Sequence, residues 1–75
     1  MPVLQQFTDS RVVMHARDHQ PPHVHVQLND GRQCMVELGR LVLIGRVKLR
    51  EIRHVLVWIE HNRIWLYLEW QKLNP

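Results

Sequence analysis

The distribution of glycine and proline divides this chain into two parts. No proline or glycine interrupts residues 46–74, whereas the segment before them contains all three glycines and the adjacent pair Pro21 and Pro22. Proline lacks a backbone N–H and glycine weakens a helix, so both residues punctuate strands and turns more readily than helices. The order predicted from this division is strands first and helix second, which is an α+β arrangement.

Alternation of apolar and polar side chains predicts the strands. Residues 11–17 and 23–28 both alternate, as expected for strands with one buried face. Residues 29–31, Asn-Asp-Gly, favour a hairpin turn with positive φ, and residues 32–38 would form the returning strand. The short apolar run at 41–44 is interpreted as a fourth strand. We therefore expect an antiparallel β-meander of three to four strands.

From Lys48 onward the apolar residues recur at spacings of three and four, which indicates a helix with one buried stripe. The expected stripe comprises Leu49, Ile52, Val55, Leu56, Ile59, Leu66, Trp70 and Leu73. Asn62 is the one candidate break, because its side chain can bind the free N–H groups of a second helix over residues 63–73. The sequence thus predicts either one long C-terminal helix or two consecutive helices, within a single domain covering residues 1–75.

Size and composition exclude several classes of protein. Cys34 is the one cysteine, so an internal disulfide framework is excluded. The first residues lack the features of a signal peptide and no apolar run is long enough for a membrane span, so we expect a cytoplasmic protein without membrane contact. A net charge of +3 permits nucleic-acid contact. Small domains often need a partner for stability, which leaves a homo-oligomer open.

Four histidines, His15, His19, His23 and His25, lie within eleven residues and surround Asp18. One hypothesis is general acid–base chemistry, with Asp18, His19, His23 and His25 as catalytic residues. A second is metal binding, although the spacing matches no zinc-finger or His-Glu-x-x-His pattern. A third is a purely structural loop stiffened by two prolines. We predict neither a metal nor a cofactor, and the residues leave open whether the chain is an enzyme.

Basic residues suggest contacts to phosphate or nucleic acid. Cations near a helix N-terminus are disfavoured by the helix dipole, so a basic helix start invites an external anion. The candidate contacts are Arg46, Arg50 and Arg53 at this helix start, together with Arg11 and Arg17, which could hold a phosphate beside the histidines. The alternative is an ordinary solvated face, on which Glu51 offsets part of the positive charge.

A second helical stripe carries bulky apolar side chains opposite the expected core. It includes Trp58, Trp65 and Leu68, which we interpret as a partner-binding surface because exposed apolar patches usually mark interfaces. The alternative is that a change of direction at Asn62 buries Trp65 in the core.

Residues 18–25, Asp-His-Gln-Pro-Pro-His-Val-His, resemble the signature of a prokaryotic family, domain of unknown function 4160. Its members look like small bacterial proteins encoded beside a second small domain, domain of unknown function 2442. Such pairs resemble type II toxin–antitoxin modules. The resemblance implies a toxin that acts on RNA or the translation machinery and binds a small antitoxin-like protein. The alternative is a non-enzymatic module that binds protein or nucleic acid and has a structural histidine loop.

Overall fold

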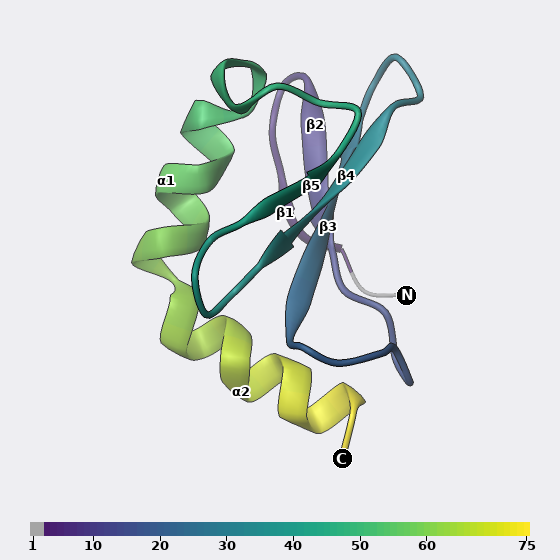
Figure 1. Cartoon of the computed structure of the whole chain (residues 1–75), viewed down its shortest axis with the longest axis vertical. Coiled ribbons are helices and arrows are strands. Elements are labelled where there is room, and N and C mark those ends of the chain that lie inside the picture. Colours follow the sequence, from purple (N-terminus) through teal and green to yellow (C-terminus); the bar gives the residue numbers. More distant parts are fainter. Residues whose placement is uncertain (1–2) are drawn as a thin grey trace.

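The computed structural model describes residues 3–75, which form a five-stranded antiparallel sheet followed by two helices (Figure 1). The strands are β1 (Val3–Gln6), β2 (Ser10–Val13), β3 (His23–Leu28), β4 (Gln33–Glu37) and β5 (Leu43–Gly45), and each pairs with the next in sequence order. A 3-10 turn η1 (Leu49–Glu51) then leads into α1 (Arg53–His61) and α2 (Arg63–Leu73). The α+β class and the meander are confirmed.

The expected number of three to four strands is wrong, because β1 adds a fifth strand at one edge. Residues 3–6 have no regular alternation, and the pairing of β1 with β2 contains an irregularity between Val3 and Gln5. The second strand is also shorter than the predicted 11–17, since the chain leaves the sheet after Val13 and Arg17 adopts φ 56°. The turn prediction is confirmed at Gly31, where φ is 96°.

The hydrophobic core lies between one face of the sheet and the two helices. Cross-strand pairs Val12–Val26, Val26–Cys34 and Val24–Val36 align the buried side chains of β2, β3 and β4 in rows. From the helical part, Ile52, Val55, Ile59, Leu66 and Trp70 cover these rows. The predicted stripe is therefore buried over most of its length; Leu49 is the exception, because it lies in η1 and is 54% exposed.

The helical part breaks at Asn62, so the two-helix alternative is confirmed. Asn62 has φ −110° and ψ 16°, and its Nδ2 donates to the carbonyl of Trp58 at 2.9 Å. The side chain therefore satisfies the end of α1, whereas we expected it to cap the start of α2, where no such hydrogen bond is present. No helix within residues 3–75 has the length and apolar character needed to cross a membrane.

Candidate histidine–aspartate site

The face of the sheet opposite the helices carries the polar positions of β3. His25 pairs with Met35 of β4, and Met35 pairs with Ile44 of β5. Because side chains alternate along a strand, these residues share a face with His23, whereas Val24 and Val26 face the helices. The histidines predicted to share a face of the strand do so.

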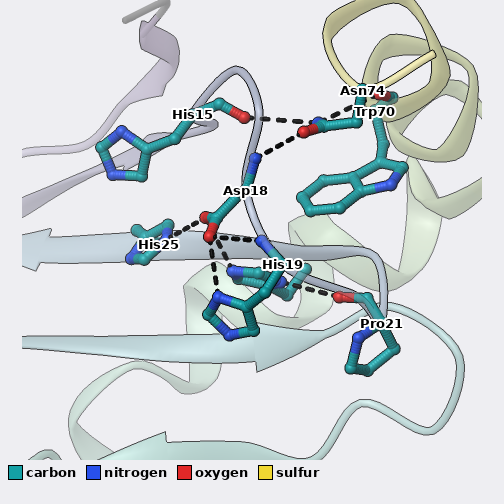
Figure 2. A network of polar contacts seen from close by, with 8 residues as sticks. His15, Asp18, His19, Pro21, His25, Trp70 and Asn74 are labelled. Carbon is teal, nitrogen blue, oxygen red and sulfur yellow. Dashed lines mark hydrogen bonds and ion pairs between the residues drawn. The ribbon is translucent and has the colours of Figure 1, made fainter.

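A carboxylate forms the centre of the histidine group (Figure 2). Asp18 Oδ2 lies 3.0 Å from Nε2 of His23 and 3.1 Å from Nε2 of His25. Its Oδ1 lies 2.9 Å from Nδ1 of His19 and accepts the His19 backbone N–H at 2.8 Å. The ring of His15 contacts that of His25, with centroids 4.3 Å apart. We call Asp18 and these four histidines the Asp18 cluster.

The last turn of α2 holds the loop that presents Asp18. The backbone N–H of Asp18 donates to Asn74 Oδ1 at 2.6 Å, while Asn74 Nδ2 donates to the carbonyls of His15 and Trp70 at 3.3 and 3.2 Å (Figure 2). Sequence reasoning missed Asn74, because it lies 56 residues beyond Asp18 and nothing in the local pattern links the two.

His23 is the most deeply buried ring of the cluster. Its side chain is 4% exposed, and the ring packs against Trp70 with centroids 5.0 Å apart. Its Nδ1 lies 2.7 Å from the carbonyl oxygen of Pro21. Since a carbonyl can only accept, Nδ1 must carry the hydrogen and Nε2 must face Asp18. The diproline loop therefore sets the orientation of this ring.

Exposure to solvent differs across the rest of the cluster. The side chains of Asp18 and His25 are each 15% exposed, whereas that of His19 is 67% exposed. A macromolecule approaching the cluster therefore meets His19 first, and the other rings lie behind it.

The electrostatics of the cluster favour an ionised carboxylate. Burial by itself raises the pKa of Asp18, but the hydrogen bonds from His25 and from the His19 N–H outweigh it and lower this pKa from 3.8 to about 2. Burial lowers the pKa of His25 below 6.5, and neighbouring His15 acts in the same direction, although the bond to Asp18 opposes both. The cluster thus combines a carboxylate with an imidazole that favours its neutral form.

A hollow of about 200 Å³ adjoins the cluster on the open face of the sheet. It is lined by His19, Pro21, His23, Met35, Glu37, Arg40, Val42 and Ile44. Arg40, which sequence reasoning did not single out, pairs with the Glu37 carboxylate at 3.2 Å beside this hollow. Concave sites with mainly apolar walls and a few polar groups are the usual form of small-ligand sites.

Of the five predicted phosphate contacts, Arg17 adjoins the cluster in sequence. It directly precedes Asp18 and is exposed. Arg11 shares the sheet face of the cluster, and its Nε donates at 2.8 Å to Gln27 of β3. Arg11 lies toward the other end of the strands, however, because Gln27 pairs with Gln33 at the start of β4.

The other three predicted contacts, Arg46, Arg50 and Arg53, are exposed but lie at the other end of the sheet. They follow β5, whose Gly45 pairs with Cys34 near the start of β4. The cluster, in contrast, lies near the end of β4, where His23 pairs with Glu37. The structure therefore does not bring these three arginines to the histidines.

The tryptophan stripe is partly exposed. Trp58 is half-buried between Phe7 and Trp65, with ring centroids 6.2 and 6.4 Å away. Trp65 is 41% exposed and Leu68 is 52% exposed. The alternative in which the break at Asn62 buries Trp65 is therefore wrong.

Comparison with protein families places the Asp18 cluster inside a matched region. The model of the family described as Domain of unknown function (DUF4160) matches residues 10–71, a segment that includes the whole of the Asp18 cluster. No curated protein and no solved structure matches the chain.

Proposed function

We propose that this chain, which belongs to the family Domain of unknown function (DUF4160), is a cytoplasmic toxin of a type II toxin–antitoxin pair and acts through the Asp18 cluster. The observation that supports this most is the convergence of three imidazoles on one carboxylate, within 3.1 Å in each case. Concentrating three imidazoles and a carboxylate in one partly solvent-accessible place serves chemistry better than it serves packing.

RNA is the target class that the surroundings of the cluster favour. His19 presents an exposed imidazole, and Arg17, two residues earlier in the sequence, is an exposed cation. An imidazole can donate or accept a proton in phosphodiester chemistry, while an arginine binds the phosphate. In this proposal His19 contacts the substrate, Asp18 orients it, and the buried His23 is a positioning residue.

Inducible expression in a bacterial host tests the proposal. We expect the wild-type chain to arrest growth, and His19→Ala and Asp18→Asn to relieve the arrest at equal protein level. His61→Ala is the matched control, because His61 is exposed at the end of α1 and lies outside the cluster. Growth arrest that persists in both cluster variants would refute a working role for the cluster.

The second candidate is a non-enzymatic binding module that docks a small antitoxin-like protein of the domain of unknown function 2442 type. Two observations favour it: His23 is fixed by internal bonds, and Ile64, Trp65 and Leu68 are exposed on α2. The same experiment separates the candidates. Under this one, the wild-type chain does not arrest growth, whereas its complex with the co-expressed neighbour forms, is abolished by Trp65→Glu and survives His19→Ala.

A further inference from the structure

The contacts of His23 create an electrostatic problem at Asp18. With its hydrogen on Nδ1, donated to Pro21, a neutral ring has a lone pair on Nε2. That lone pair faces Asp18 Oδ2 at 3.0 Å, and a carboxylate oxygen is also an acceptor. Two acceptors repel each other at this distance, so the arrangement calls for a positive charge between them.

A third donor atom points at the same place. Nε2 of His25 lies 3.1 Å from Asp18 Oδ2, and one ligand atom from each of Asp18, His23 and His25 lies within 4.8 Å of the others. A zinc ion about 2.0–2.2 Å from nitrogen and oxygen ligands in tetrahedral geometry separates those ligands by about 3.3–3.5 Å. The two separations that involve Asp18, 3.0 and 3.1 Å, fall only a few tenths of an ångström short of this range.

We propose that Asp18, His23 and His25 bind one divalent transition-metal ion of the zinc type. Imidazole nitrogen with carboxylate oxygen suits such ions, whereas magnesium and calcium prefer oxygen alone. Three protein ligands leave a further coordination position for water or a substrate atom, the arrangement typical of reactive metal sites. The hollow beside the cluster is lined by His23, one of the three ligands, and by the exposed His19.

The surroundings of the three ligands match those of known metal sites. Metal-binding histidines usually donate their second N–H to a carbonyl or carboxylate, which fixes the ring. Pro21 provides this carbonyl for His23. Asn74 holds the Asp18 backbone by a hydrogen bond of 2.6 Å. The site is thus supported from the diproline loop and from α2.

This inference concerns the same residues as the proposed function but does not depend on toxicity. A chain that binds metal without arresting growth would refute only the toxin. A chain that arrests growth without binding metal would refute only the metal site.

Calorimetric titration of the full-length, untagged chain with zinc chloride after chelator treatment tests the proposal. We expect one zinc per chain, and a loss of affinity of at least about 100-fold in His25→Ala and in Asp18→Asn. His54→Ala is the matched control, because His54 pairs with Asp9 at 3.1 Å on the exposed surface, and among residues 3–75 no third ligand joins this pair. This variant should bind zinc as the wild type does.

Circular dichroism tests whether each variant is folded. If His25→Ala is unfolded, the conclusion rests on Asp18→Asn. Absence of zinc binding by the wild type would overturn the proposal. An equal loss of zinc affinity in His25→Ala and His54→Ala would overturn it as well. Nitrogen NMR of His23 gives an independent readout. A ring protonated on both nitrogens at neutral pH and unchanged by zinc would show that a proton supplies the positive charge instead.

Discussion

Asn74 shows how much of the candidate site depends on a single side chain. Its amide contacts three backbone groups at once: the N–H of Asp18 and the carbonyls of His15 and Trp70. A backbone carbonyl has no side-chain identity, so these bonds constrain the loop without requiring particular residues in it. The position of the Asp18 carboxylate therefore depends on Asn74, whose side chain holds the backbone and has no ionisable group.

We expect Asn74→Ala to lower the free energy of unfolding by about 1–3 kcal/mol, because the Asp18 N–H loses its partner. Urea denaturation measures this change. Gln71→Ala is the control, since Gln71 is exposed one turn earlier on α2 and should change stability by less than about 0.5 kcal/mol. Equal stability of the two variants would mean that Asn74 does not hold the loop.

At the level of elements, Leu66 and Ile64 show how strongly the two sides of one helix differ in burial. Leu66 is fully buried against the core, whereas Ile64 is 79% exposed on the same α2 helix. We expect Leu66→Ala to cost about 2–5 kcal/mol through lost burial and a residual cavity. Ile64→Ala should cost less than about 0.5 kcal/mol.

Guanidinium denaturation followed by circular dichroism measures both substitutions. If the two variants were equally stable, α2 would not pack on the sheet through the stripe that contains Leu66. The comparison is well matched, because both positions are aliphatic, lie two residues apart and have no proline or glycine nearby.

The elements that the sequence predicted are those whose apolar pattern is regular. Val24 and Val26 alternate with His23 and His25, so strand β3 and its two faces followed directly from the pattern. Strand β1 could not be predicted in this way, because Val-Leu-Gln-Gln has no alternation and its extended form depends on pairing with β2.

The candidate site was predictable in the same partial way. Asp18, His23 and His25 come from one short segment, so their proximity in sequence was enough to predict that they form one group. Asn74, Arg40 and the hollow depend on how distant segments meet, and no periodicity encodes that. The sequence predicts Arg46, Arg50 and Arg53 as anion contacts at a basic helix start, and the register of β4 places them at the other end of the sheet from the histidines.

At the scale of the whole molecule, the reactivity of the Cys34 thiol measures how often the sheet and the helices separate. The thiol is buried in the core, 2% exposed, and burial raises its pKa to about 11, with the charge of Glu51 acting in the same direction. The thiolate is the reactive form of cysteine, so the folded chain should resist thiol reagents.

We therefore expect Cys34 labelling by a disulfide reagent to require global opening of the domain. Leu66→Ala should raise the labelling rate by at least about 30-fold, the equivalent of 2 kcal/mol, while Ile64→Ala leaves it unchanged. Spectrophotometric assay of the released thiol measures the rate. Labelling of the folded wild type as fast as in denaturant would contradict the buried position of Cys34.

The contact between the rings of His23 and Trp70, with centroids 5.0 Å apart, gives the cluster its own fluorescent reporter. Indole emission responds to the charge and contacts of an adjacent ring, so whatever occupies the cluster should alter the fluorescence of Trp70. Replacing Trp58 and Trp65 with phenylalanine would silence the background. The chain then becomes a label-free sensor with which collections of metals, nucleotides and peptides can be screened.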